Sequence, residues 1–426
     1  MTCDQIASLR PALVGWIASF GDCFCRRQTF GHFQAYLLGL LADVPRKSVE
    51  PIALAMGVAV RTLQEFLSHF VWDHDRLRDQ LQRRIIDQHG SGEAIGVIDE
   101  TGHPKQGDKT PGVQRQYCGQ SGKIDNCVVA VHLLYTTGDG SNPFSGMLDT
   151  DLFLPTGWDD DSPAIQDRRQ EAGIPESLHH RPKWRIAVEQ VKRAIGNGVR
   201  FSWLTFDEHY GMTPGFWFEL DAMGQRAIGE VPPNFRCWPT PPKYKSLQGP
   251  HASKRVDRVV QHSPVFYRQD WQTVTVKAAT RGPIRWRVKA ARVQLPDTSG
   301  GITEPTDRRY WLIVAKHIAT DEVKYFVSNA AESASLAEML TAAFTRWQVE
   351  QWFARAKQRC GLGAFEVRKY VGLMRHWLCC AVVMAFLSAQ TCRLRGEKRA
   401  DHVRAGHPRG RDVVREDHRR VLPLLA

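Results

Sequence analysis

Two short apolar segments that each end in an aspartate constrain the fold of this chain more than any other feature. Residues Ala94–Ile98 lead into Asp99, and residues Phe201–Phe206 lead into Asp207. Short apolar segments bounded by polar residues are typical of buried β-strands. If the two strands are neighbours in one sheet, both carboxylates emerge at the same edge of that sheet.

A later stretch supplies a third acid. The segment Thr341–Leu362 contains no proline and only one glycine, next to its end, and its good helix formers predict one helix. At about 100° per residue, Arg346, Glu350 and Lys357 fall on one face of that helix. An acid between two bases suits a site that holds a metal ion and a phosphate. The same spacing also fits a solvent-exposed face with an ion pair between Arg346 and Glu350, which an isolated helix would favour.

The size and charge of the chain bound its class. A chain of 426 residues could hold two or three domains, each with an ample core. The formal net charge is +12 and the pI is about 9.3. This excess implies a polyanionic partner, with nucleic acid as the first candidate. A merely basic soluble protein would have the same composition.

Cysteine usage and hydropathy indicate a cytoplasmic protein. Ten cysteines form no CxxC pair, so we predict free thiols in a reducing compartment and no structural zinc. The N-terminus does not have the layout of a signal peptide. The longest uncharged apolar run, Trp377–Thr391, has 15 residues, fewer than the roughly 20 that span a membrane. We therefore expect a buried helix there and no membrane association.

Changes in residue pattern and composition divide the chain into five predicted segments. After N-terminal helices, strands alternate with helices, which predicts an α/β core; a proline-rich link then opens a β-rich insertion, and helices return before a basic tail. We expect the tail to be flexible or to become ordered only on nucleic acid. The predicted boundaries are 1–90 for the N-terminal helices, 91–231 for the first part of the core, 232–330 for the insertion, 331–392 for the C-terminal helices of the core and 393–426 for the tail.

The N-terminal helices are a candidate DNA-binding domain. A helix over Ser48–Ala55, a glycine-containing turn and a helix over Val60–Phe70 have the layout of a helix-turn-helix DNA reader. Lys47 and Arg61 could then meet DNA phosphates. A plain helical hairpin that packs on the next domain fits the same short pattern equally well.

The predicted insertion has strands of alternating apolar and polar residues, which favours an antiparallel sheet. Its polar positions are basic and include Arg285 and Arg287, which could face a DNA backbone. The strands are expected at Trp271–Ala278, Ile284–Val293, Arg309–Lys316 and Lys324–Ser328.

A polar, glycine-rich connection follows the first aspartate. This stretch, Gly102–Gly122, is longer than a tight hairpin requires, so we expect an irregular loop. Within it, Lys105 could meet DNA, although a solvated position fits better. Tyr117 could stack on a base, although a core tyrosine fits at least as well.

Convergence of Asp99, Asp207 and Glu350 would create a site for Mg²⁺ or Mn²⁺, because these hard cations prefer oxygen ligands. Two such ions about 4 Å apart could activate a water or a 3′-hydroxyl and stabilise the leaving oxygen of an in-line phosphoryl transfer. Each aspartate could instead be a turn or cap residue. Glu100 and Glu208 follow the two aspartates, and the alternation of a pleated strand would point them to the opposite side.

Three motifs carry a resemblance to a known family. The first is VIDETGHPKQG, followed by QYCGQSGKIDNC; the second is WLTFDEHYG; and the third is RWQVEQWFARAK, which contains Arg-x3-Glu-x6-Lys. Over roughly residues 25–390 the chain resembles a DDE transposase of bacterial insertion sequences. It is most similar to members with a β-rich insertion before the catalytic glutamate. It departs from the family's Tyr-x2-Arg-x3-Glu-x6-Lys signature at Ala343, which stands in place of the tyrosine.

The resemblance implies a ribonuclease-H-like catalytic core and a set of roles. Asp99, Asp207 and Glu350 would be the catalytic, metal-binding triad, with Mg²⁺ as the cofactor and Mn²⁺ as a substitute. Arg346 and Lys357 would contact phosphates of the transposon end, Arg as a bidentate donor and Lys as a point charge. The protein would bind double-stranded DNA as a homodimer around two element ends, and would cut and join strands. The alternatives are a stand-alone metal-dependent nuclease and a domesticated DNA-binding protein that no longer cuts.

Overall fold

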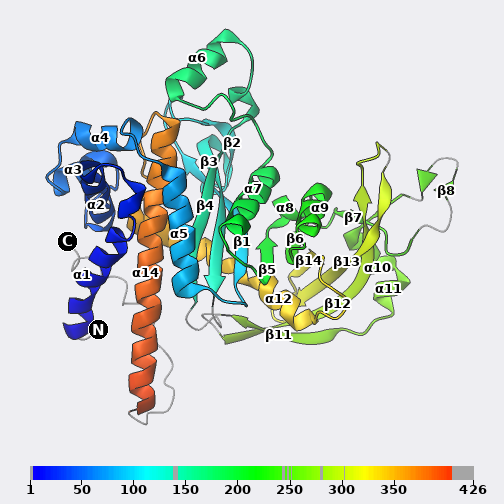
Figure 1. Cartoon of the computed structure of the whole chain (residues 1–426). Coiled ribbons are helices and arrows are strands. Elements are labelled where there is room, and N and C mark those ends of the chain that lie inside the picture. The colour runs from blue at the N-terminus through cyan, green and yellow to red at the C-terminus, as the bar shows by residue number, and fades with distance from the viewer. Residues whose placement is uncertain are drawn as a thin grey trace.

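A computed structural model gives the fold of the chain (Figure 1). It describes residues 3–137, 143–241, 245–246, 249–250, 252–278, 282–301 and 303–404.

The N-terminal segment is helical, as predicted, and packs against the last helix of the chain. Figure 1 shows the long helix α14 (Tyr370–Arg404) between the first four of these α-helices and the sheet, with the fifth on the sheet side of α14. The N-terminal helices are α1 (Cys3–Ala18), η1 (Gly21–Cys23), α2 (Arg27–Leu41), α3 (Val49–Ala55), α4 (Val60–Ser68) and α5 (His74–His89).

The pair α3 and α4 forms the predicted helix–turn–helix layout. Gly57, between them, has a φ of +64°, a conformation that glycine adopts without strain. The C-terminal end of α4 is held by Arg375 of α14, whose Nη1 donates to the carbonyl oxygens of Phe66 (3.3 Å) and Leu67 (3.1 Å). The same buried guanidinium lies over the Trp72 ring, 4.3 Å from its centroid. This contact fixes the helical pair to the C-terminal part of the core.

A ten-stranded mixed sheet forms the centre of the molecule, in the order β11-β12-β13-β14-β6-β5-β1-β3-β2, with β4 also paired to β3. The neighbours β1, β5 and β6 are parallel, and all other pairs in this sheet are antiparallel. Its strands are β1 (Ile95–Pro104), β2 (Gln114–Cys118), β3 (Lys123–Thr137), β4 (Phe144–Phe153), β5 (Trp203–Phe206), β6 (Ala227–Val231), β11 (Gln272–Ala278), β12 (Gly282–Asp297), β13 (Glu304–His317) and β14 (Val323–Ser328).

The strands predicted in 232–330 are present and antiparallel, but they extend the core sheet. Strand β14 pairs along β6, so the sheet runs without interruption from β11 to β2. This pairing satisfies the backbone groups that an exposed edge of β6 would leave unpaired. The short strands of this region are β7 (Arg236–Cys237), β8 (Lys245–Ser246), β9 (Gly249–Pro250) and β10 (Lys254–Arg255).

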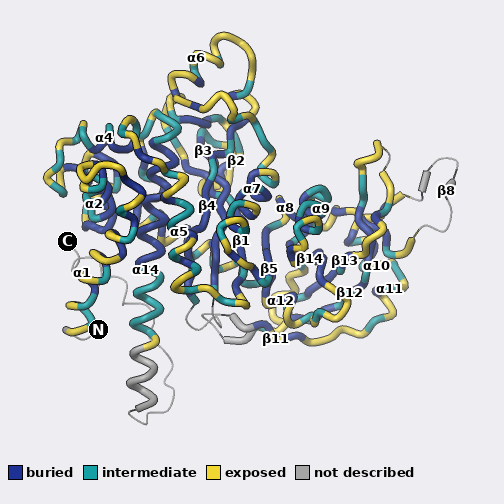
Figure 2. The backbone as a smooth tube through the Cα atoms, in the orientation of Figure 1, coloured by how far each residue is buried: buried dark blue, intermediate teal, exposed yellow. Residues whose placement is uncertain are grey.

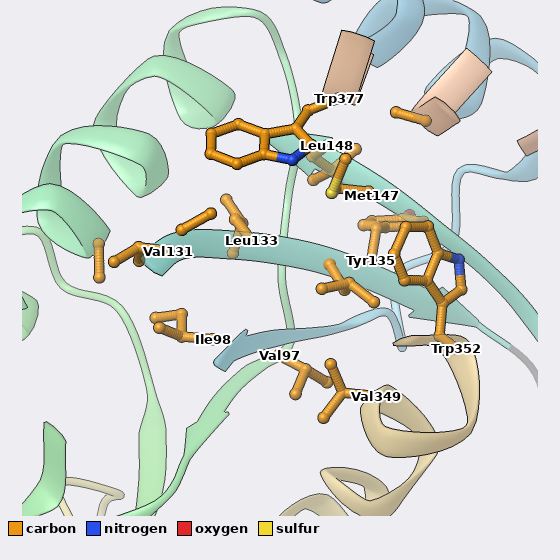
Figure 3. Packing of buried hydrophobic residues seen from close by; sticks show 14 of the residues in the cluster. Val97, Ile98, Val131, Leu133, Tyr135, Met147, Leu148, Val349, Trp352 and Trp377 are labelled. Carbon is orange, nitrogen blue, oxygen red and sulfur yellow. The ribbon is translucent and has the colours of Figure 1, made fainter. Parts of the chain in front are cut away.

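Helices cover both faces of the sheet, and the deepest burial follows its central strands (Figure 2). In the core beside β1, Val97 lies next to Val349, and Trp352 and Tyr135 lie nearby (Figure 3). The remaining helices are η2 (Thr156–Trp158), α6 (Pro163–Ala172), α7 (Lys183–Gly196), α8 (Glu208–Gly211), α9 (Pro214–Ala222), α10 (Val256–His262), α11 (Pro264–Tyr267), α12 (Leu336–Thr345) and α13 (Trp347–Cys360).

The prediction of one helix over Thr341–Leu362 is wrong, because the chain forms α12 and α13 with a break at Arg346. Helix α12 packs mainly on β5, β6 and β11, whereas α13 packs on α2 and α14, and both helices contact β1, so they diverge from that strand. At the break, the backbone N–H of Arg346 donates to Ala343 and that of Val349 donates to Arg346, each three residues back. Tertiary packing therefore overrides good helix formers here.

The irregular loop expected over Gly102–Gly122 is present only at residues 105–113, and the rest of that expectation is wrong. Strand β1 continues to Pro104, and β2 pairs with the start of β3 to form a hairpin. Gly122, with a φ of +65°, allows the turn between β2 and β3.

The buried helix predicted over Trp377–Thr391 is confirmed as part of α14. The segment Tyr370–Gly396 is long and apolar enough to cross a membrane by length and composition alone, and 83% of its apolar window is buried inside the protein. Helix α14 also continues through residues 393–404 of the predicted flexible tail, whereas 405–426 lie outside the described residues.

We predict that Arg375→Ala lowers the free energy of unfolding by about 3 kcal/mol, because it leaves buried carbonyl groups without a donor. Chemical denaturation of the full chain measures this change. The control is Arg368→Ala, at an exposed position just before α14, which should stay within about 0.5 kcal/mol of wild type. Equal effects of the two substitutions would contradict the docking role of Arg375.

Candidate active site

Asp207 directly follows β5, whereas Asp99 lies within the parallel neighbour β1, which continues to Pro104, so the predicted strand end at Asp99 is wrong. In the register of β1 and β5, Val97 is opposite Thr205, so Asp99 and Asp207, each two residues further on, reach the same edge. Asp99 is buried, with 9% of its surface exposed. Asp207 caps the short helix α8, and its Oδ1 accepts from the backbone N–H of His209 at 3.0 Å. The cap role considered from the sequence therefore coexists with a position beside Asp99.

Asp99 and Asp207 are shielded from water, and nearby negative charge acts on both carboxylates. Burial and the negative charge of Asp207 raise the pKa of Asp99 to about 7. Burial and the negative charge of Glu100 raise the pKa of Asp207. A pair of buried carboxylates is stabilised by a cation placed between them.

Arg346 bridges the first aspartate and the glutamate. Its Nη1 lies 3.4 Å from Oδ2 of Asp99, and its Nη2 lies 3.3 Å from Oε1 of Glu350. The ion pair between Arg346 and Glu350 that a solvent-exposed face would show is therefore present, and the Glu350 side chain is 53% exposed. Among the residues that the structure describes, no three His, Cys, Asp or Glu side chains are grouped as metal ligands. The guanidinium of Arg346 lies against both carboxylates and offsets part of their negative charge.

Lys357 lies on the same helix, in the field of Asp99. Burial lowers the pKa of Lys357, while the nearby Cys118 and Asp99 act in the opposite direction. Beneath the helix, His132 is directly opposite Asp99 in the β1–β3 register, and its ring lies 5.0 Å from that of Phe353. Burial and the charge of Lys357 lower the pKa of His132 to about 3, so this histidine is neutral at physiological pH.

Glu100 is part of the site, although the alternation of the strand set it aside. Its Oε2 accepts a hydrogen bond from the Tyr210 hydroxyl at 3.1 Å, and its Oε1 pairs with Lys183. Tyr210 is fully buried on α8, three residues after Asp207. The Tyr210–Glu100 hydrogen bond therefore ties the turn that carries Asp207 to strand β1. The aromatic residue shortly after the second aspartate in WLTFDEHYG was the sequence signal for this contact.

Two of the lysines predicted to meet DNA are turned inward. The Lys105 amine donates to the carbonyl oxygens of Gly363 (3.0 Å) and Phe365 (2.7 Å), and burial lowers its pKa to about 8. The expected solvated position of Lys105 is therefore wrong. The Lys47 amine donates to the carbonyl oxygen of Ala42, and burial lowers its pKa too.

The three predicted DNA-contacting arginines outside α13 lie on the surface. Arg61, on α4, forms an ion pair with Glu65 at 2.9 Å while 89% of its side chain is exposed. Arg285 is exposed on β12, and Arg287 lies 3.8 Å from Asp321. Strand β12 is separated from β1 by β13, β14, β6 and β5, so these arginines are distant from the carboxylates.

Comparison with known proteins places the chain in a family. A profile described as DDE superfamily endonuclease matches residues 19–283, more than half of the chain. The chain therefore belongs to the DDE superfamily of endonucleases, which confirms the resemblance found in its sequence. The matched region includes Asp99 and Asp207 and ends before Glu350.

Two individual proteins are similar to the chain. A probable transposase for insertion sequence element IS701 from Microchaete diplosiphon is 27% identical over 278 residues, which cover 64% of this chain and 66% of that protein, just under two thirds. A piggyBac transposase, solved by cryo-electron microscopy as a synaptic complex with hairpin DNA, is 12% identical. That similarity covers 92% of this chain and 74% of the piggyBac chain, with a TM-score of 0.42.

We predict that Lys105→Met lowers the free energy of unfolding by about 2 kcal/mol, because two carbonyl groups lose a charged donor. The matched control is Lys109→Met, since Lys109 is 62% exposed and pairs with an exposed glutamate. It should change stability by less than about 0.5 kcal/mol. Denaturant titration compares the two, and a Lys105→Met protein as stable as wild type would show that the inward contacts do not matter.

Proposed function

We propose that this protein is a transposase that binds the ends of its mobile element, cleaves DNA strands and joins them to a target by in-line phosphoryl transfer. The observation that carries the proposal is the proximity of Asp99, on β1, and Asp207, directly after its parallel neighbour β5, in a chain of the DDE superfamily. The pKa of Asp99, raised by burial and by its neighbour, supports a site that is completed by a cation.

We further infer the division of the chain. The strands of 91–231 and the helices of 331–392 would form a ribonuclease-H-like catalytic core, and 232–330 would be an insertion that widens its sheet. Residues 1–90 would bind DNA, and 393–426 would assist. Two such chains would act on two element ends in the bacterial cytoplasm.

The residues at the site fit a divalent cation, Mg²⁺ or in its place Mn²⁺. Asp99 and Asp207 would hold it, because carboxylate oxygens are its preferred ligands and the two neighbouring negative charges repel each other. Glu350 would join them once Arg346 turns to another partner. When bound, the ion would lower the pKa of the attacking water or 3′-hydroxyl and neutralise charge on the reacting phosphate.

Arg346 and Lys357 would orient the phosphodiester. The guanidinium of Arg346 bridges Asp99 and Glu350, and a phosphate oxygen could replace either carboxylate in the same bidentate geometry. Lys357 would supply a point charge about three helical turns further along the chain, on α13. On binding DNA, Arg346 would leave the two carboxylates and contact a phosphate. Glu350 would then be free to join Asp99 and Asp207, so DNA binding would assemble the three acids.

The other predicted DNA contacts separate into two groups. Arg61, Arg285 and Arg287 would meet backbone phosphates, because their side chains reach the surface. Lys47 and Lys105 would act indirectly. Lys105 bonds to the segment 361–365 that follows α13, and the side chain of Lys47 packs closely on Gly361 in the same segment.

We predict that Asp207→Ala lowers Mg²⁺-dependent nicking more than about 100-fold, because even indirect partners of metal ligands cost 10–100-fold when removed. The substrate is a labelled duplex from the genomic DNA that flanks this reading frame. Binding of that duplex should persist, since the aspartate contributes no positive charge.

The matched control is Asp270→Ala, at an exposed aspartate just before β11, and it should nick like wild type. Joined products with paired ends would distinguish a transposase from a nuclease on the same core. A wild-type protein that binds the duplex but never nicks it would favour the non-cutting alternative.

A further inference from the structure

The hairpin of β2 and β3 exposes an apolar pair that packing of the chain does not explain. Tyr117 and Ile124 are directly opposite each other in the antiparallel register. Each is 63% exposed. Tyr117 is therefore not the core tyrosine that its sequence context allowed. Cross-strand aromatic and β-branched pairs stabilise sheets when they are covered, so this pair is suited to a partner.

The hairpin holds this pair in a rigid position. Asn126 Nδ2 donates to the carbonyl oxygens of Lys105 and Gly107, each at 2.8 Å. Gln116 Nε2 donates to the carbonyl oxygen of Cys127 at 3.0 Å. The strand ladder and these side-chain bonds anchor the hairpin to the end of β1, so its exposed tip loses little entropy on binding.

The exposed pair lies on the same face of the sheet as the first catalytic aspartate. Asp99 is opposite His132 on β3, and side chains of a strand alternate between the two faces. Ile124, an even number of residues before His132, therefore shares the face of Asp99, and Tyr117 shares it through the register. Helix α13 covers this face beside Asp99 and ends at Cys360.

The charge of this face suits a polyanion. Arg115 is opposite Asn126 on the face of Tyr117, whereas Asp125 is opposite Gln116 on the other face. Arg115 is exposed. An aromatic side chain beside an exposed arginine fits nucleic acid, whereas a small hairpin tip offers far less than the roughly 800 Å² per partner of a stable protein interface.

The length of β3 gives the distance between the catalytic carboxylates and the exposed pair. His132 and Ile124 are eight residues apart on β3, which corresponds to about 27 Å at about 3.4 Å per residue. A DNA duplex rises about 3.4 Å per base pair. A duplex that follows β3 from the carboxylates would therefore reach the tip after about eight base pairs.

We propose that this face of the β2–β3 hairpin binds the duplex that is being cut, about eight base pairs from the cleaved phosphodiester. Arg115 contacts a phosphate, and Tyr117 with Ile124 forms an apolar wedge in the minor groove. The proposal rests on the proposed function, and it assigns a role to the motif QYCGQSGK.

The test measures binding of the full chain to a fluorescein-labelled 40-base-pair duplex from the genomic DNA that flanks this reading frame, by anisotropy. Tyr117→Ala should weaken binding about tenfold, as loss of one aromatic–base contact does, whereas Tyr117→Phe should stay within about twofold. Arg115→Ala should reduce the slope of log K against log salt by about one. The matched control is Tyr267→Ala, at a tyrosine that is 53% exposed on α11, with wild-type affinity expected.

Photocrosslinking locates the contact. A benzoylphenylalanine at position 117 should crosslink to nucleotides about eight base pairs from the nick that wild type makes. Wild-type affinity of Tyr117→Ala, or crosslinks confined to a second protein chain, would overturn the proposal while wild-type nicking leaves the proposed function intact. A wild-type protein that neither binds nor nicks the duplex would overturn both.

Discussion

The site depends on the confinement of two negative charges by parallel strand pairing. Because β1 and β5 are hydrogen-bonded neighbours up to Val97 and Thr205, the chain holds Asp99 and Asp207 close together just beyond that pairing. Burial strengthens their repulsion. Surrounding residues offset this repulsion. Arg346 forms an ion pair with Asp99, and Lys183 forms one with Glu100. The Tyr210 hydroxyl donates to Glu100 and so holds the turn after β5. The arrangement favours a cation or a phosphate-bound guanidinium at this edge.

The rest of the fold transmits this constraint outward. Helix α13 begins at the break that lets Arg346 face Asp99, and the segment after it rests on the inward-turned Lys105. Helix α14 then carries Arg375, which holds the end of α4. The helix–turn–helix pair and the carboxylates are thus linked through one short stretch of chain. A DNA duplex read by α4 would meet the carboxylates at a set distance if this link stays rigid.

Much of the fold could be predicted from periodicity, and the exceptions have physical causes. The apolar segments ending in Asp99 and Asp207 are strands, because burial on both faces selects apolar residues. Strand β2 was missed because its residues are mainly polar and show no apolar alternation. The break at Arg346 was missed because no proline or glycine marks it; it arises where the two helices diverge from β1.

The site was predictable to a similar depth. The motifs predicted the three acids, and strand order explains why two of them are neighbours. The inward direction of Lys47 and Lys105 could not be predicted, because their partners are backbone carbonyls of residues brought close only by folding. Strand alternation points Glu100 away from the face of Asp99. Its hydrogen bond with Tyr210 was not predictable from that alternation, because it joins β1 to the turn after β5.

The central claim is that Asp99 and Asp207 share a divalent ion when DNA is present. Anomalous diffraction from crystals of the full chain with Mn²⁺ and a nicked duplex tests it most directly. The account predicts a manganese peak within ligand distance of both aspartates, with Arg346 moved from carboxylate to phosphate. Manganese bound elsewhere, with Arg346 still between Asp99 and Glu350 on a bound duplex, would contradict it.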